Sequence, residues 1–94
     1  MQVVGLLILH DFCRNHTDCT QQINAWIAEA QDAEWKTPSD IKRRFVTASF
    51  LPDDRVIFNI KGNKYRLDTK IYYQRRAIIV KRVGTHEEYD RWRF

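Results

Sequence analysis

The sequence predicts an α+β fold, with helices in the first half of the chain and mostly antiparallel strands in the second half. Residues 54–83 contain three successive β-rich runs separated by turn residues. Residues 6–33 carry apolar side chains at the i, i+3, i+4 spacing of amphipathic helices. The charge follows the same division. Residues 1–40 hold two basic and six acidic residues (−4), whereas residues 41–94 hold fourteen and six (+8).

The length and composition indicate one globular domain, residues 1–94. A hydrophobic content of 44% is too high for a disordered chain, and 94 residues suffice for one modest core. No apolar run is long enough to span a membrane, and Met1–Leu9 lacks the basic region and cleavage site of a signal peptide. We therefore expect a cytoplasmic protein, in which Cys13 and Cys19 are buried free thiols without a metal-binding spacing.

The helical half is expected to begin with a strand. Met1–Gly5 is short and apolar and must join the later sheet, and Leu6–Asn15 follows as a helix. Asp18–Ala33 is the clearest helix, and Thr17 or Asp18 is its expected N-cap. The core-facing stripe of this helix consists of Ile23, Trp26, Ile27 and Ala30.

A third, short helix is predicted by the capping-box pattern Thr37-Pro38-Ser39-Asp40. Its last turn carries three cations, Lys42, Arg43 and Arg44. Two interpretations stay open for them: they interact favourably with the helix dipole, or they contact RNA phosphates. Val46–Asp53 is expected to be a loop.

Three strands are expected to follow: Asp54–Ile60, Lys64–Tyr73 and Ala77–Val83. Gly62-Asn63 is a two-residue hairpin loop between the first two. The third is dense in Ile and Val, which is typical of a central strand covered on both faces. Arg82 stands where the alternation predicts an apolar side chain, and nothing in the sequence explains it. A short helix, Glu87–Trp92, ends the chain.

One face of the middle strand is mostly basic. It consists of Lys64, Arg66, Asp68, Lys70 and Tyr72. Such a face suits a bound polyanion such as RNA. The alternative is an ordinary solvated face.

Three segments resemble the HigB family of bacterial type II toxins: WKTPSDIKRRF, DRVIFNIKGNKYRL and VKRVGTHEEYD. The similarity runs from about Trp26 to Asp90. It implies the RelE-like microbial-RNase fold, a small antiparallel-rich sheet with N-terminal helices on one face and a short C-terminal helix. It also implies an mRNA interferase that acts in most relatives in the 30S A site of the ribosome, without a metal or other cofactor. In such enzymes the 2′-hydroxyl attacks the adjacent phosphate and leaves a 2′,3′-cyclic phosphate and a 5′-hydroxyl. The implied partner is HigA, an antitoxin with a helix-turn-helix domain.

The candidate catalytic residues are Arg66, His86, Tyr89, Lys61 and Lys81. The candidate RNA-binding residues are Lys64, Asn59, Lys42, Arg43, Arg44 and Tyr72. A guanidinium such as that of Arg66 matches two phosphate oxygens, although Arg66 could instead pair with Asp68 or with the last helix. His86 is suited to proton transfer, or it caps the last helix. Tyr89 lies one helical turn further on and is a candidate for proton donation or base stacking.

Two other functions stay open from the sequence. One is a non-catalytic module that binds RNA or the ribosome through the basic face. The other is a degenerate toxin that acts with its antitoxin in promoter repression. Lys61 and Lys64 at the hairpin mouth are equally consistent with solvated charges, and Asn59 with a structural role.

Overall fold

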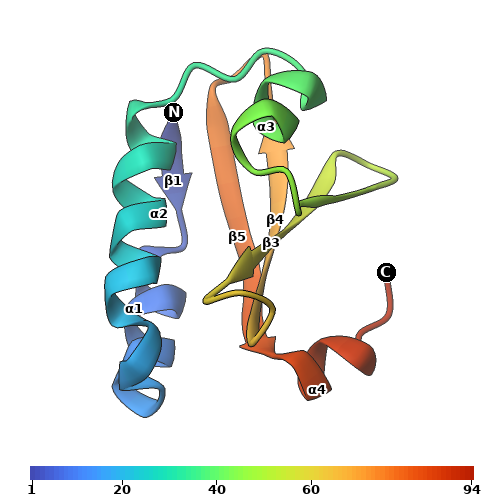
Figure 1. Cartoon of the computed structure of the whole chain (residues 1–94). Coiled ribbons are helices and arrows are strands. Elements are labelled where there is room, and N and C mark those ends of the chain that lie inside the picture. Colours follow the sequence, from blue (N-terminus) through green and yellow to red (C-terminus); the bar gives the residue numbers. More distant parts are fainter.

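The structure, a computed structural model that describes residues 1–94, is an α+β fold around one five-stranded mixed sheet (Figure 1). The strand order is β1-β5-β4-β3-β2, with β1 parallel to β5 and all other neighbours antiparallel. The predicted fold class is confirmed. The elements are β1 (Gln2–Val4), α1 (Leu6–Asn15), η1 (Thr17–Cys19), α2 (Thr20–Asp32), α3 (Pro38–Arg44), β2 (Ser49–Leu51), β3 (Arg55–Ile60), β4 (Tyr65–Tyr72), β5 (Ala77–Thr85) and α4 (His86–Asp90).

Strand β1 joins the sheet as predicted and is also tied to α2. The amino group of Met1 donates hydrogen bonds of 2.8–3.1 Å to three carbonyl oxygens at the end of α2. This contact is favourable because the C-terminus of a helix carries partial negative charge. Gly5 ends the strand with a φ of 101°, and a Cβ at this position would lie 3.0 Å from the Cβ of Val80. Both the backbone angle and the close approach require glycine.

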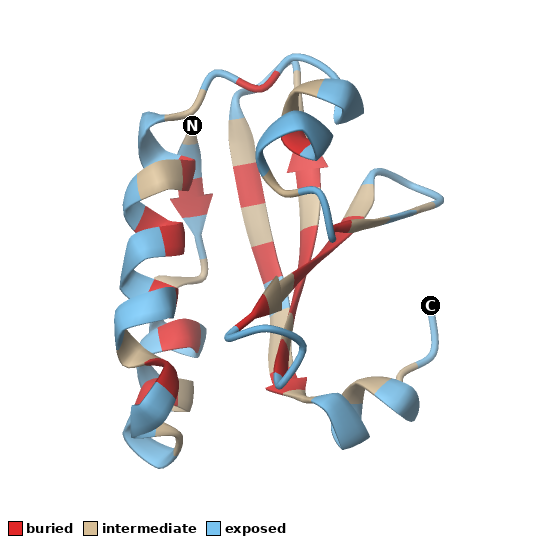
Figure 2. Cartoon of the chain, viewed as in Figure 1, coloured by how far each residue is buried: buried red, intermediate tan, exposed pale blue.

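The core lies between the sheet and helices α1, α2 and α3 (Figure 2). Helix α1 has the predicted bounds, and the predicted stripe of α2 is fully buried. The N-cap prediction for α2 is wrong. Cys19 occupies that position without a side-chain cap, because the carboxylate of Asp18 is used by the β3–β4 hairpin instead. Both cysteines are buried free thiols, as expected.

Helix α3 begins with the predicted capping box, in which Thr37 and Asp40 each accept a hydrogen bond from the other's backbone N–H. The helix and the segment before it cover an aromatic cluster centred on Phe58 of β3. The Phe58 ring lies 5.1 Å from that of Phe45 and 5.3 Å from that of Trp26, both edge-to-face. Such pairs stabilise a core by about 0.5–1.5 kcal/mol each beyond the area they bury.

The strands β3, β4 and β5 follow the predicted order, but their connections differ from the prediction. The β3–β4 loop contains four residues rather than two, with positive φ at Lys61 (55°) and Gly62 (69°). Strand β2 lies in the segment predicted as a loop. It is a three-residue edge strand, paired with β3 through its backbone, and is too short to show an alternation pattern.

An irregularity in β5 explains Arg82. Asp68 of β4 lies opposite Arg82, whereas the next residue, Thr69, lies opposite Val80. Lys81 is therefore the extra residue of a β-bulge, which reverses the alternation and turns Arg82 away from the helices. The strand lies inside the sheet, between β1 and β4, as predicted, but the prediction that both of its faces are covered is wrong, because Lys81 is exposed.

No helix of this structure combines the length and the hydropathy that a membrane-spanning helix requires.

Candidate functional site

Helix α4 lies against the end of β5, on the sheet face that points away from α1 and α2. Its N-terminus is fixed by a capping box between Thr85 and Glu88. The helix starts at His86, one residue earlier than predicted, so His86 is not the cap. A Cβ on Gly84 would lie 2.9 Å from the ring of Trp92 and 3.2 Å from the Cβ of Glu88. Glycine at position 84 therefore allows α4 and the segment after it to contact the strand directly.

Arg66 and Tyr89 are brought together beside this helix. The Arg66 guanidinium lies 4.7 Å from the centre of the Tyr89 ring, and Arg66 faces Gly84 across the sheet. Its Nε is buried and has no hydrogen-bond partner, and no ion pair involves Arg66. The alternative interpretation, in which Arg66 pairs with Asp68 or with a carboxylate of α4, is not what the structure shows.

Asp68 is occupied by two other arginines. It is completely buried, and its carboxylate accepts hydrogen bonds from Arg55 and from the Nε of Arg82, the latter at 2.9 Å. The Arg82 guanidinium also lies 4.3 Å from the ring of Trp92 and 4.9 Å from the ring of Phe94. This cluster fastens the C-terminal segment to the sheet. This cluster was not predicted, because the alternation pattern of β5 does not reveal the bulge that places Arg82 opposite Asp68.

His86, the first residue of α4, lies near a carboxylate at the last residue of the same helix. Its Nδ1 lies 3.2 Å from a carboxylate oxygen of Asp90. A carboxylate at this distance can accept a hydrogen bond from a protonated Nδ1, and Nε2 is then the ring nitrogen free to exchange a proton. The contact between Asp90 and His86 was not predicted from the sequence.

His86 lies at an open cavity of about 520 Å³ between three parts of the chain. The lining residues are His16, Asn63, Lys64, Tyr65, Thr85, His86 and Glu87. His16 comes from the junction of α1 and η1, Asn63 to Tyr65 from the hairpin, and the rest from the β5–α4 junction. His16 was not predicted as a residue of this site. No sequence pattern links it to His86, because the proximity arises only from the packing of α1 on the sheet.

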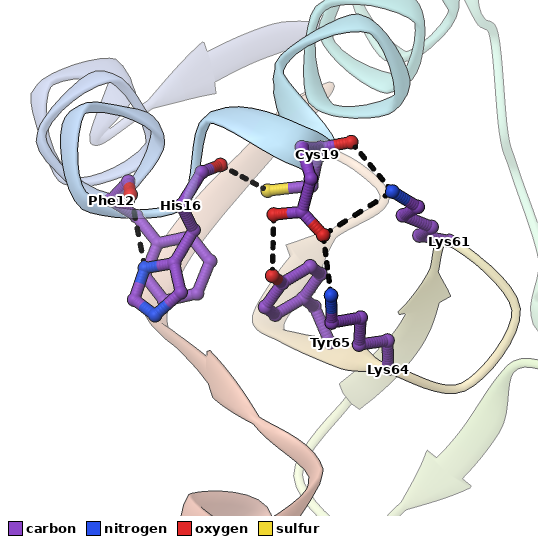
Figure 3. Close-up of polar contacts among 7 residues, drawn as sticks. Phe12, His16, Cys19, Lys61, Lys64 and Tyr65 are labelled. Carbon is purple, nitrogen blue, oxygen red and sulfur yellow. Dashed lines mark hydrogen bonds and ion pairs between the residues drawn. The ribbon is translucent and has the colours of Figure 1, made fainter.

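The two hairpin lysines converge on one carboxylate (Figure 3). The ammonium groups of Lys61 and Lys64 lie 3.2 Å and 2.6 Å from Oδ2 of Asp18, and the Tyr65 hydroxyl donates to Oδ1 at 2.6 Å. The hydrogen bonds from Lys64 and Tyr65 hold the pKa of Asp18 well below its usual range. The bond to Asp18 in turn raises the pKa of Lys64. Lys61, predicted as catalytic, is thus part of a surface ion-pair cluster.

Most of the remaining predicted residues lie apart from this site; Asn59 is the exception, since it is the cross-strand neighbour of Arg66 on β3. Tyr72 is at the far end of β4, about 23 Å from Tyr65 for an eight-residue strand. Lys81 is exposed at the bulge. The others make local contacts: Lys42 donates to the carbonyl of Ala48, Arg43 pairs with Asp40, Arg44 pairs with Glu29, and the Asn59 amide lies 3.5 Å from the Thr47 carbonyl. No group of three or more His, Cys, Asp or Glu side chains is placed to bind one metal ion.

Comparison with known proteins agrees with this arrangement of sheet and helices. Curated protein sequences gave no match. A family model does match, over residues 19–92 of the 94, and its description is a HigB toxin, the RelE-like toxic component of a toxin–antitoxin system. This match covers the last residue of η1, all of α2 and every later element, including the Arg66–Tyr89 pair and the β5–α4 junction. The chain therefore belongs to the HigB toxin family of RelE-like toxin–antitoxin components.

Proposed function

We propose that this chain is an endoribonuclease that cleaves mRNA, and that cleavage takes place in the 30S A site of the ribosome in the bacterial cytoplasm. The products are a 2′,3′-cyclic phosphate and a 5′-hydroxyl, and a HigA-type helix-turn-helix antitoxin neutralises the toxin. One observation carries the proposal: Arg66 is a half-buried arginine beside α4 whose buried Nε has no hydrogen-bond partner and which forms no ion pair, whereas Arg55 and Arg82 are both paired with Asp68.

Arg66 provides the phosphate-binding group. A guanidinium remains charged at all physiological pH values and fits two phosphate oxygens at once. The Tyr89 ring orients it, which lowers the entropy lost when it binds a phosphate. A buried Nε without a partner is unfavourable in the free protein, and an anion that accepts a hydrogen bond from it removes this cost. Tyr89 is better explained by this positioning role than by base stacking, since its ring is packed against Arg66 and, at 5.6 Å, Trp92.

His86 provides the proton acceptor. It lies two residues beyond Gly84, the cross-strand neighbour of Arg66, and the proposal requires that an RNA strand bound at Arg66 also reaches His86. In the reaction, the 2′-oxygen forms a bond to phosphorus while the bond from phosphorus to the 5′-oxygen breaks. The 2′-hydroxyl proton moves to Nε2 of His86. The carboxylate of Asp90 stabilises the imidazolium that results, as in other carboxylate–histidine pairs.

The lysines near the site attract RNA through their long-range electrostatic field and take no direct part in the reaction. Asp18 neutralises part of the charge of Lys61 and Lys64, so their role is long-range attraction of the RNA backbone. The same long-range role is proposed for Lys81 and for the exposed cations of α3.

The test is induced expression in a bacterial host with and without the antitoxin, followed by mapping of mRNA 5′ ends. We expect growth arrest and new 5′-hydroxyl ends inside translated reading frames, both relieved by the antitoxin. Arg66→Ala should lower cleavage about 10²–10³-fold, as loss of one transition-state donor does. Arg75→Ala is the matched control, because it removes an equally charged, exposed side chain from the turn between β4 and β5, at the other end of the sheet from Arg66.

Three outcomes would contradict the proposal in different ways. Normal growth and intact mRNA, from a folded wild-type protein, would reject the nuclease. Salt-sensitive RNA binding without cleavage would indicate a binding module instead. Equal loss of activity in Arg66→Ala and Arg75→Ala would reject the specific role of Arg66.

A further inference from the structure

His16 shares a cavity with His86, although no sequence pattern connects the two. The cavity of about 520 Å³ opens between the α1–η1 junction, which carries His16, and the β5–α4 junction, which carries His86. The proposed reaction has an acceptor for the 2′-hydroxyl proton but no assigned donor for the leaving 5′-oxygen. A second imidazole at the same cavity has the chemistry that this step requires.

The ring of His16 is held in one orientation by three contacts (Figure 3). It stacks on Phe12 with a centroid distance of 4.1 Å and meets Tyr65 edge-on at 5.5 Å. Its Nδ1 lies 3.2 Å from the carbonyl oxygen of Phe12. A carbonyl can only accept, so Nδ1 carries a proton and Nε2 is the atom that exchanges one.

Helix capping does not account for this ring. The backbone N–H of His16 already donates to the Phe12 carbonyl at 3.0 Å, which closes the last turn of α1. The Nδ1 of the side chain forms a second hydrogen bond to the same oxygen, and this bond fixes the tautomer and the orientation of the imidazole. A fixed, half-buried imidazole at a polar cavity is the arrangement that proton transfer needs.

Lys64 connects the two walls of the cavity. Its ammonium group lies 2.6 Å from Asp18, two residues after His16, and its carbonyl oxygen accepts a 3.0 Å hydrogen bond from the backbone N–H of His86. The hydroxyl of Tyr65 adds a second bond to Asp18 at 2.6 Å. The segments that carry the two histidines are therefore held at a set separation through one hairpin residue.

We propose that His16 is the second catalytic histidine and protonates the leaving group; the inference rests on the proposed function. Protonated His16 gives the proton on Nε2 to the 5′-oxygen as the bond from that oxygen to phosphorus breaks. His86 takes the 2′-hydroxyl proton in the same step, so one imidazole gains the proton that the other loses. Exchange with water restores both. The assignment of His86 as the acceptor follows from the proposed function, in which His86 takes the 2′-hydroxyl proton.

The other titratable groups at the cavity are Lys64 and Tyr65 of the hairpin and Glu87 of α4. The wild-type rate should depend on pH as a bell, because His86 must be neutral and His16 protonated. His16→Gln should lower the cleavage rate by about 10²–10⁴-fold and abolish the alkaline limb of the profile. His10→Gln, on the exposed side of α1, is the matched control and should leave both rate and profile unchanged.

A modified substrate separates the two histidines. We would place a single 5′-bridging phosphorothiolate linkage at the cleaved position of an mRNA on programmed ribosomes. A thiolate leaves without protonation, so His16→Gln should cleave this substrate at nearly the wild-type rate, whereas His86→Gln should remain slow. The wild type itself should lose its alkaline limb on this substrate, which tests the role of His16 without any substitution.

The outcomes distinguish this inference from the proposed function. Absence of cleavage by the wild type would reject both. Cleavage by the wild type with an unchanged rate and profile in His16→Gln would reject only the role of His16. An alkaline limb that persists in the wild type on the phosphorothiolate substrate would do the same.

Discussion

Replacing Asp68 with alanine is the sharpest test of how the C-terminal segment is held on the sheet. The Asp68 side chain is 0% exposed and bridges Arg55 and Arg82, whose side chains are 22% and 33% exposed. Removing one partner of a buried ion pair costs about 3–5 kcal/mol, mostly because charge is left unpaired. Both arginines retain some contact with water, so we expect the lower end, about 3 kcal/mol. For a protein of this size, this corresponds to a fall in Tm of roughly 12–24 °C.

The assay is thermal unfolding followed by circular dichroism at pH 7, together with urea titration. Asp11→Ala is the matched control. It removes the carboxylate of an exposed Asp11–Arg14 pair, 3.1 Å apart, and should change stability by less than about 1 kcal/mol. Adding Arg82→Met to Asp68→Ala should recover part of the loss, because one unpaired cation is gone. A Tm for Asp68→Ala within a few degrees of the control would refute the reasoning.

Two further predictions concern the cavity and its supports. Gly84→Ala would place a Cβ 2.9 Å from the ring of Trp92 and 3.2 Å from the Cβ of Glu88, so both Trp92 and α4 must shift. We expect the free energy of unfolding to fall by about 1–3 kcal/mol and the rate of mRNA cleavage to fall more than tenfold. Unchanged cleavage would show that α4 does not need this contact. Asp18 has a folded-state pKa below its ordinary value of 3.8, chiefly through its hydrogen bond with Lys64. Its contribution is therefore present above about pH 4 and is lost as pH falls through the folded-state pKa. We expect the difference in free energy of unfolding between the wild type and Asp18→Asn to shrink below about pH 4. An equal difference at pH 3 and pH 7 would contradict this.

The helices followed closely from local sequence. Leu6–Asn15 has the predicted bounds, and the Thr37–Asp40 capping box forms as predicted. These features depend on residues within one or two turns, so the periodicity of apolar side chains and the chemistry of one cap suffice to identify them. Asp18 shows the limit: as a local cap it was a good candidate, but a contact with Lys64, distant in the chain, took its carboxylate.

Four of the five strands, and their order along the chain, were predictable from the sequence, but their register was not. The β3–β4 loop is two residues longer than its Gly-Asn pair suggested. Strand β2 was not predicted because a three-residue strand is too short to show an alternation of apolar and polar side chains. The bulge at Lys81 had the largest consequence. One extra residue moved Arg82 to the face of Asp68, and only the neighbouring strand reveals such a shift.

Of the candidate site, Arg66, His86 and Tyr89 were predicted from the sequence, on the basis of their residue types and of the resemblance of the surrounding segments to the HigB family. Their partners depended on the fold. Arg66 lies free of Asp68 since two other arginines occupy that carboxylate, and His16 reaches the His86 cavity since α1 ends beside the hairpin. Local periodicity and residue chemistry specify helices, strands and candidate groups. Which charges neutralise one another, and which distant side chains share a cavity, depends on register and packing across many residues, and these arise only when the whole chain is folded.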